Sequence, residues 1–340
     1  MAWKIGEFDR IDRFLKPLAA GFEGSLNLTD DAALLAPIAG EEHVVTLDTM
    51  VEGTHFLPDT EPEQLAQKLL RVNLSDLAAM GARPVAYFLS LTLPDKCDER
   101  WLHAFTDGLA RDQETFGLHL AGGDTTSTKG PLVISITIIG SVPAGQAFKR
   151  SGAKAGDAVM VSGTVGDGYL GLMAAQGGLG TLPDVARDAL MKRYNLPNPR
   201  VTLARWLREQ GIAVHAAVDL SDGLAADLGH ICRHSNLRAE IGINRIPLSQ
   251  SSKMAIEAQF ISAVELLGGG DDYELIFTVP EANAEALIAA ADRANMPKLS
   301  MIGKMVSPDT DQGKSDVCVY VYDADGRELP LSVSGWQHGQ

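Results

Sequence analysis

Hydrophobic and polar positions along the first half of the chain alternate between the period of a helix and that of a strand. We predict helices where apolar side chains recur every three or four residues, at 6–18, 62–80 and 99–116. We predict strands where apolar and β-branched residues run together, at 32–35, 43–47, 85–93, 118–121 and 132–142. Gly81 is a candidate helix cap, and the strand at 118–121 is expected to break at Gly122 and Gly123.

The second half continues the same mixture after a stretch of small and polar residues, SGAKAGD at 151–157. Helical spacing is predicted at 168–176, 181–194, 200–210, 222–234 and 281–294, and strands are predicted at 158–162, 216–219 and 239–243. The pattern predicts an α/β (α+β) protein with mixed sheets flanked by helices. We expect an N-terminal domain at 1–149 and a C-terminal domain at 150–340, because 340 residues exceed one ordinary core.

The composition and the N-terminal sequence favour a cytoplasmic protein. A formal net charge of −15 argues against nucleic acid or an anionic membrane as a partner, and suits binding of divalent cations. The N-terminus lacks the apolar segment of a signal peptide, and the longest apolar run, at 132–142, is about half a membrane span. Cys97, Cys232 and Cys318 are few and far apart, so a disulfide framework is not expected.

Aspartates recur where predicted strands or loops end, which is where ligands collect in α/β proteins. These residues are Asp30, Asp31, Asp48, Asp124, Asp219 and Asp222, and Asp76 lies on a predicted helix. Any one of them could simply form a turn or cap a helix. Together they have few basic neighbours in the sequence, and clustered carboxylates are tolerated mainly where cations lie between them. The set therefore indicates a site for Mg²⁺ or a similar ion.

Three glycine-rich stretches are candidates for phosphate binding. GGDTT at 122–126 combines flexible backbone N–H groups with an acid and hydroxyls, although it could be an ordinary turn. In DLSDGL at 219–224, Ser221 could cap a helix, bind phosphate at the helix start, or do both. GDGYLG at 166–171 fits the dinucleotide fingerprint, but no strand ending in an acid follows at the required distance, so dinucleotide binding is not favoured.

Seven motifs in order resemble the thiamine-monophosphate kinase family, which shares a superfamily with aminoimidazole ribonucleotide synthetase and selenophosphate synthetase. They are DDAALL at 30–35, DTMVEGTHF at 48–56, VNLSDLAAMGA at 72–82, GGDTT at 122–126, RSGA at 150–153, VDLSDGL at 218–224 and GGDDYEL at 269–275. The resemblance extends from about residue 5 to residue 338. The THF and YEL stretches favour the kinase over its relatives.

The resemblance implies a homodimer that transfers a phosphoryl group from ATP to thiamine monophosphate, with several Mg²⁺ ions. The residues implied as metal ligands are Asp31, Thr46, Leu47, Asp48, Asp76, Asp124, Asp219 and Asp222. Gly123, Asp124, Arg150 and Ser221 would contact ATP, and Asp48, Asp124 and Asp222 would act directly in catalysis. His55, Asp271 and Trp336 match positions that contact the thiamine ligand.

Two positions depart from the family pattern. Leu47 stands where relatives often carry Thr, so it can offer a metal only its backbone, and Asp271 replaces a Glu, which shortens its reach by one methylene. The acceptor is already a phosphate monoester, so positioning and charge neutralisation are expected to dominate over general-base catalysis. Two other functions stay open: a purine-type ligase of the same superfamily, and a non-catalytic protein that binds nucleotide or metal.

Overall fold

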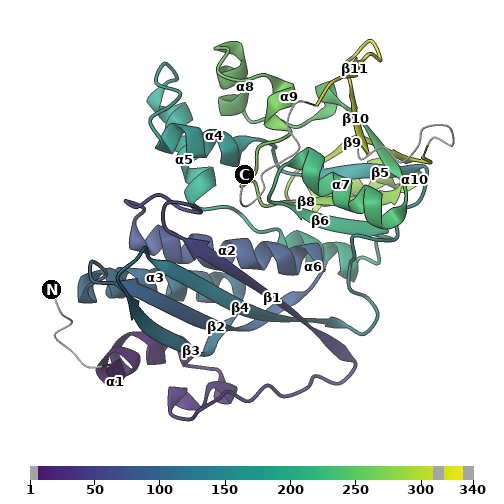
Figure 1. The fold of residues 1–340 in the computed structure, drawn as a ribbon. Coiled ribbons are helices and arrows are strands. Elements are labelled where there is room, and N and C mark those ends of the chain that lie inside the picture. The colour runs from purple at the N-terminus through teal and green to yellow at the C-terminus, as the bar shows by residue number, and fades with distance from the viewer. Residues whose placement is uncertain (1–6, 309–317, 332–340) are drawn as a thin grey trace. The chain divides into compact units, whose positions relative to one another are not determined.

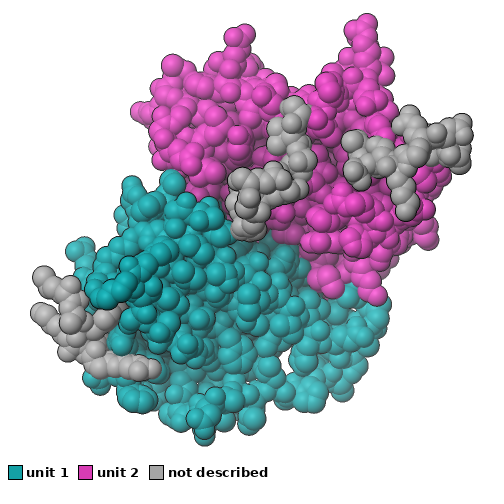
Figure 2. Space-filling model, viewed as in Figure 1, with its two compact units in different colours: residues 1–77, 82–147 teal, residues 78–81, 148–340 magenta. Residues whose placement is uncertain are grey.

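The computed structural model describes residues 7–308 and 318–331. The chain divides into two compact units, coloured separately in Figure 2: residues 1–77 with 82–147, and residues 78–81 with 148–340. Each unit has its own sheet with helices packed against it (Figure 1). The predicted mixed α/β fold is thereby confirmed.

The first unit contains a four-stranded sheet in the order β1-β4-β2-β3. Strands β1, β4 and β2 are antiparallel neighbours and β3 is parallel to β2. Their bounds are Glu41–Val51 for β1, Arg83–Pro94 for β2, His119–Thr128 for β3 and Val133–Pro143 for β4. On β4 the isoleucines at 134, 136 and 138 are buried while the residues between them are only partly covered, so one face of the sheet is more open than the other.

Two long helices, α2 (Pro62–Ala79) and α3 (Glu99–Phe116), cover the other face of this sheet (Figure 1). Both lie where the helical spacing predicted them. Asp98 caps α3 by accepting a hydrogen bond from the backbone N–H of Trp101. The two helices approach closely at Gly108, where a Cβ atom would lie 2.3 Å from the carbonyl oxygen of Glu63, so only glycine fits there.

The start of the chain departs from the prediction. The helix expected at 6–18 is replaced by α1 (Glu7–Arg10), a π-helical turn (Ile11–Leu15) and a 3-10 turn (Lys16–Ala19). Pro17 lies at the start of that last turn and cannot donate the backbone hydrogen bond of an α-helix. A further 3-10 segment spans Glu23–Leu28, and the strand predicted at 32–35 is absent from the structure.

The second unit contains a seven-stranded mixed sheet in the order β11-β10-β7-β9-β5-β8-β6. All neighbours are antiparallel except β10 and β7, which are parallel. The strands are β5 (Asp157–Ser162), β6 (Ala216–Leu220), β7 (Arg238–Gly242), β8 (Glu274–Pro280), β9 (Leu299–Val306), β10 (Val319–Tyr322) and β11 (Glu328–Leu329). Strands β5 and β6 are buried along their whole length, which explains the apolar runs at 158–161 in β5 and 216–218 in β6.

Two layers of helices belong to this unit. Helix α7 (Leu224–Ser235) packs its apolar side chains into the same core as the strands, and α10 (Glu281–Arg293) contacts β5, β8 and β9. A separate apolar cluster joins residues of α4 (Asp167–Ala175), α5 (Asp184–Asn195), α8 (Gln250–Glu257) and α9 (Ala263–Leu266). Helix α6 (Val201–Glu209) and a 3-10 turn (Ile243–Arg245) complete the unit. Among the described residues, no helix is both long and apolar enough to cross a membrane.

The first unit has a buried charge whose contribution to stability can be measured. Asp112 on α3 accepts hydrogen bonds from Arg71 Nε (2.7 Å), Arg71 Nη2 (2.9 Å) and Gln67 Nε2 (2.8 Å) on α2. We expect Asp112→Ala to lower the free energy of unfolding by about 3–5 kcal/mol, because buried donors lose a charged acceptor. Asp107→Ala, on the exposed face of the same helix, should change it by less than about 0.5 kcal/mol. Urea unfolding followed by fluorescence measures both, and equal effects would contradict this assignment.

Candidate active site

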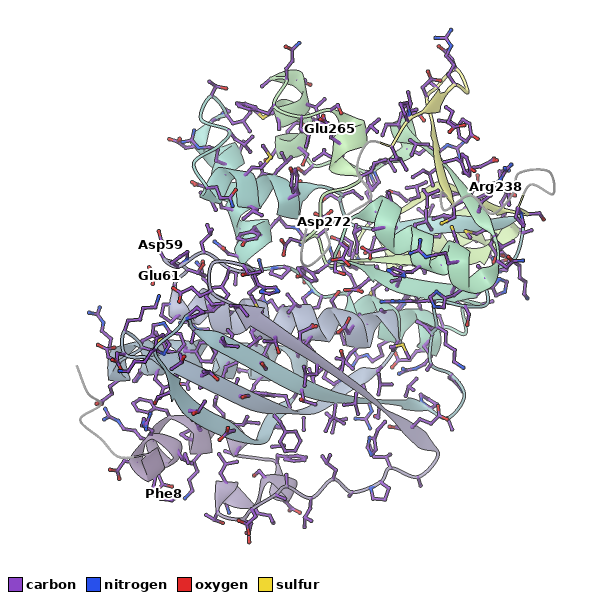
Figure 3. The ribbon with its side chains drawn as sticks, in the orientation of Figure 1. Phe8, Asp59, Glu61, Arg238, Glu265 and Asp272 are labelled. Atoms are coloured by element: carbon purple, nitrogen blue, oxygen red, sulfur yellow. The ribbon has the colours of Figure 1, made fainter. Side chains whose placement is uncertain are left out.

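A groove of about 720 Å³ lies over the open face of the four-stranded sheet in the first unit. Asp30 and Asp31, from the loop before β1, line it together with Gly123 and Asp124 from β3. Phe8, near the N-terminus and labelled in Figure 3, also lines this groove. Two acidic motifs that are about 90 residues apart in the sequence therefore face one solvent-accessible hollow, as expected if they share a ligand.

The GGDTT motif lies inside a strand, so the predicted break at Gly122 and Gly123 was wrong. Strand β3 continues to Thr128 and has a bulge at Ala121, where the pairing shifts from Tyr87–Leu120 to Phe88–Gly122. Bulges redirect side chains and are frequent beside functional sites. At Gly123 a Cβ atom would lie 2.0 Å from the carbonyl oxygen of Leu89, so the close approach of β2 requires glycine there.

A second group of predicted metal ligands joins β1 to α2. Thr46 Oγ1 donates a hydrogen bond to Asp76 Oδ2 at 2.6 Å, and the backbone N–H of Asp48 donates to Asn73 Oδ1 at 3.1 Å. Asn73 is held in turn by its bond to the Leu69 carbonyl (2.9 Å). Burial, and then the negative charge of Asp76, raises the pKa of Asp48 to about 6. A cation bound beside Asp48 would offset this repulsion, which is why the pair stays a candidate for metal binding.

Leu47 and His55 lie on either side of this group in the sequence. The Leu47 side chain points to the open face of the sheet and is 60% exposed, which leaves its backbone as the only metal-binding part. His55 Nδ1 accepts a hydrogen bond from the backbone N–H of Val51 at 3.0 Å, so a neutral ring carries its proton on Nε2. Phe56 lines a hollow of about 200 Å³ whose other walls include Trp101 and, labelled in Figure 3, Asp59 and Glu61.

A third group lies in the second unit, where β6 ends and α7 begins. Asp219 is buried on β6, and the backbone N–H groups of Ser221 and Asp222 both donate to Asp227 Oδ2 at 2.9 Å. Burial raises the pKa of Asp227 to about 7, although these two donors and the charge of Arg150 oppose the shift. Lys149, the residue before Arg150, accepts a hydrogen bond from the backbone N–H of Ala217 on β6 at 2.8 Å, so Arg150 follows a residue bonded to this strand.

The suggestion that Ser221 caps this helix was wrong. Helix α7 begins at Leu224, the N-cap position is Gly223 with φ of 115°, and no side chain caps the helix. Asp227 fixes the turn instead. Sequence reasoning missed this residue, although an acid between Leu224 and Leu228 on the apolar face of a predicted helix is a usable signal of a buried polar role.

The Ser221 turn rests on the segment that carries Asp271. The backbone N–H of Asp271 donates to the Ser221 carbonyl (2.9 Å), and that of Tyr273 donates to the Leu220 carbonyl (2.7 Å). Asp271 (φ of 68°) and Tyr273 (φ of 53°) are both in the left-handed region, which L-residues seldom adopt. The Tyr273 hydroxyl donates to Asp271 Oδ1 at 3.3 Å and so orients the carboxylate assigned to the thiamine ligand.

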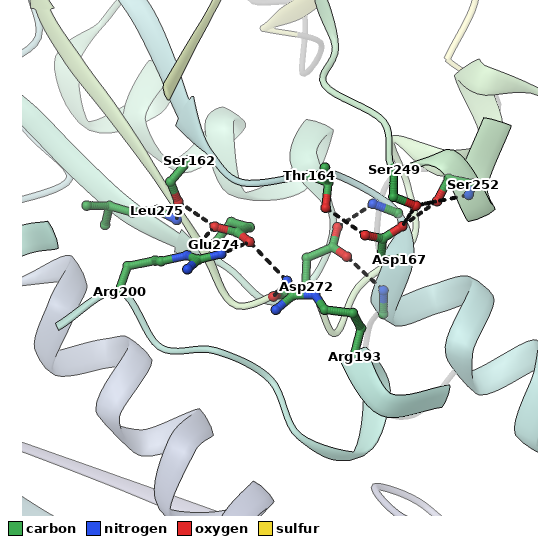
Figure 4. Close-up of polar contacts among 12 residues, drawn as sticks. Ser162, Thr164, Asp167, Arg193, Arg200, Ser249, Ser252, Asp272, Glu274 and Leu275 are labelled. Atoms are coloured by element: carbon green, nitrogen blue, oxygen red, sulfur yellow. Dashed lines mark hydrogen bonds and ion pairs between the residues drawn. The ribbon is translucent and has the colours of Figure 1, made fainter. Parts of the chain in front are cut away.

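Buried acids hold this segment from behind (Figure 4). Asp272 accepts hydrogen bonds from the backbone N–H groups of Gly166 (2.6 Å) and Gly168 (2.8 Å), and burial raises its pKa to about 8. These are the glycines of the dinucleotide-like fingerprint, and their N–H groups bind a side chain of this protein. Glu274 accepts from Arg193 (2.9 Å), Arg200 Nε (2.5 Å) and the Ser162 hydroxyl (2.5 Å). Sequence reasoning assigned no role to these supporting residues.

The predicted site residues thus fall into three groups, two in the first unit and one in the second. Each consists of carboxylates beside backbone N–H groups and hydroxyls, the atoms that Mg²⁺ and phosphate bind. Within the described parts of the chain, no three His, Cys, Asp or Glu side chains lie close enough together to hold a metal ion. Trp336 lies outside the described residues.

Comparison with known proteins gives matches along nearly the whole chain. Residues 29–142 match the family AIR synthase related protein, N-terminal domain, and residues 154–314 match its C-terminal domain. A thiamine-monophosphate kinase of Caulobacter vibrioides is 42% identical over 98% of this chain and 91% of its own.

Two solved structures extend this similarity to the fold. Thiamine-monophosphate kinase from Stenotrophomonas maltophilia is 39% identical with a TM-score of 0.81, over 96% of this chain and 98% of that one. AaThiL complexed with AMPPCP and TMP is 29% identical with a TM-score of 0.75, over 98% and 97% of the two chains. The chain belongs to the thiamine-monophosphate kinase family.

Proposed function

We propose that this protein transfers the terminal phosphoryl group of ATP to thiamine monophosphate and forms thiamine diphosphate. The observation that carries the proposal is similarity over nearly the full length to thiamine-monophosphate kinases, one of them solved with AMPPCP and TMP. The site groups fit this reaction. They supply acids and backbone donors for a triphosphate, and the family's thiamine contacts correspond to His55 and Asp271 beside them.

We infer that several Mg²⁺ ions act in the reaction. The donor atoms are hard oxygens: carboxylates of Asp31, Asp48, Asp76, Asp124, Asp219 and Asp222, the Thr46 hydroxyl and the Leu47 carbonyl. Asp48 lies in one row across the sheet with Gly123, through Ile136 and Leu89, so Asp48 and Asp124, the residue after Gly123, are three strands apart. Three strand spacings correspond to roughly 14 Å between the two backbones. Two oxygen ligands of one Mg²⁺, in contrast, lie within about 4 Å of each other. This spacing supports more than one ion.

The chain's own residues would mainly hold and align the two substrates. When bound, Mg²⁺ supplies positive charge that offsets the repulsion between the two phosphate groups. Gly123, Arg150 and Ser221 would contact the phosphates of ATP, where Arg150 adds a fixed positive charge. The attacking oxygen of thiamine monophosphate is already largely deprotonated near pH 7, so no residue has to remove its proton.

Recognition of the thiamine part would use aromatic and acidic surfaces. Asp271, and Trp336 beyond the described residues, are the family positions for this contact. His55 Nε2–H provides a donor whose direction is set by the Val51 backbone. Phe56 and Trp101 line a hollow that also contains Asp59 and Glu61, a combination that suits a flat organic cation.

We infer that two copies of the chain pair through the open face of the four-stranded sheet. Val45 and Leu47 on β1 are 61% and 60% exposed on that face, although both are large and apolar. Such side chains are normally covered when they adjoin one another on a sheet. A homodimer would cover them and enclose the groove that Asp31 and Asp124 line. We place the enzyme in the cytoplasm, since its three cysteines are all free thiols.

The activity is tested by incubating the protein with ATP, Mg²⁺ and thiamine monophosphate and separating the products by chromatography. We expect thiamine diphosphate, formed in step with ADP. Asp48→Asn and Asp124→Asn should each lower turnover by at least about 100-fold, because each removes a charge that holds the metal in the transition state.

Asp188→Asn, on the exposed side of α5, is the matched control and should leave turnover unchanged. Near-normal turnover of both site variants at saturating Mg²⁺ would contradict the metal assignment. ADP formation that depends on another acceptor would favour a purine-type ligase, and absence of any turnover would favour a protein that only binds nucleotide.

The proposed dimer is tested by placing a charge on the open sheet face. Val45→Glu should convert dimers to monomers, because two carboxylates would be buried against apolar surface. Val185→Glu, on α5 of the second unit, is the control, since Val185 is 81% exposed. Sedimentation equilibrium measures both. A monomeric wild-type protein, or dimers that survive Val45→Glu unchanged, would rule out this interface.

A further inference from the structure

Two of the three cysteines meet in the second unit, although 86 residues separate them in the sequence. Cys232 lies on α7 within the apolar core, and Cys318 immediately precedes β10. Cys318 packs against the apolar cluster that contains Cys232, and its Sγ donates a hydrogen bond to the carbonyl oxygen of Gly229 (3.6 Å), which lies one turn before Cys232 on α7. We propose that this pair is a thiol-modification site, in which Cys318 reacts with small disulfide molecules and Cys232 then displaces the adduct to form a Cys232–Cys318 disulfide.

The two sulfurs differ in access, which sets the order of the steps. Cys318 is partly exposed, whereas Cys232 is fully buried behind it. A molecule arriving from solvent therefore meets the Cys318 sulfur first. A Cβ atom added at Gly229 would lie 3.5 Å from Cys318 Sγ, which places this sulfur against the surface of α7.

Arg233 makes Cys318 the better nucleophile of the pair. Its Nη1 donates a hydrogen bond to Cys318 Sγ at 3.8 Å, and a guanidinium in this position favours the thiolate. The hydrogen bond from Cys232, followed by the charge of Arg233, lowers the pKa of Cys318. The same hydrogen bond and burial raise the pKa of Cys232, so one thiol holds the shared proton while the other approaches the reactive form.

The chemistry balances with a small disulfide, RSSR, as oxidant. The Cys318 thiolate attacks one sulfur of RSSR, which forms the mixed disulfide Cys318–S–S–R and releases RS⁻. Cys232 loses its proton to that thiolate or to water, and its sulfur attacks Cys318 Sγ and displaces the second RS⁻. In total two protein thiols are oxidised, and one RSSR is reduced to two RSH.

Cys97 serves as an internal contrast. It is buried in the first unit, where burial raises its pKa to about 12. A thiol with these properties reacts slowly. In the folded protein we therefore expect modification at Cys318 and Cys232, while Cys97 stays reduced.

The test treats the full-length protein with oxidised glutathione and follows its intact mass and its peptides by mass spectrometry. The wild-type protein should lose two hydrogen atoms and yield a peptide pair linked through Cys232 and Cys318. Cys232→Ser should instead accumulate one glutathione on Cys318, since nothing displaces it. Cys318→Ser should leave Cys232 reduced. Modification of Cys232 at an unchanged rate in Cys318→Ser, or a wild-type protein that gives no linked pair, would overturn the proposal.

A second pair of variants tests the role of Arg233 without removing a thiol. Arg233→Gln should slow glutathione attachment in the Cys232→Ser background by about threefold or more at constant pH, because the thiolate loses its cation. Arg293→Gln, an exposed arginine at the end of α10, should leave the rate unchanged. Equal rates in both variants would remove Arg233 from the site. These measurements follow thiols alone, so their outcome is independent of the kinase activity.

Discussion

Buried carboxylates hold the loops that carry the candidate site in the second unit. Asp227, Asp272 and Glu274 are each almost fully buried, and each accepts hydrogen bonds from backbone N–H groups or from arginines. A buried carboxyl group is costly, and it is tolerated only where its oxygen atoms are hydrogen-bonded. The turn at Ser221 and the segment at Asp271 therefore have one arrangement that satisfies these acids, and other arrangements leave a buried acid without donors.

The hydrogen bonds to these buried acids explain why Asp271 and Tyr273 keep a left-handed backbone conformation. Such backbone conformations cost of order 1 kcal/mol each and survive only where the surroundings over-determine them. Here, contacts on both sides of the segment fix its backbone conformation. The Ser221 turn receives the backbone N–H groups of the segment, while Asp272 and Glu274 anchor its far side to α4, α5 and Arg200. The segment at Asp271 is therefore held on both sides by polar contacts, several of them buried.

The periodic helices and strands were predictable from sequence, because hydrophobic spacing reports burial directly. Helix α3 and the buried strands β5 and β6 illustrate this. The prediction of one continuous N-terminal helix was wrong. Hydrophobic spacing alone suggested it, but Pro17 and nearby glycines interrupt the helix. The strand break predicted at Gly123 was wrong because this glycine allows the backbone to pack closely against Leu89 and does not form a turn. The position of Asp227 on an apolar helix face signals a buried polar role, but its partners are backbone groups, so the sequence does not identify them. Strand order, which sets Asp48 three strands from Gly123, is likewise invisible in motif spacing.

The backbone conformation at position 271 gives the presence of Asp, where relatives carry Glu, a second structural consequence. Asp and Asn are several-fold enriched among L-residues at positive φ, because their short polar side chains can bond locally, and Glu lacks this advantage. With φ of 68° and a bond from the Tyr273 hydroxyl, Asp271 is well matched to its own backbone. The shorter side chain thus lowers the conformational cost of the loop. A lineage that accepts this exchange can keep the shape of the loop at 271–273.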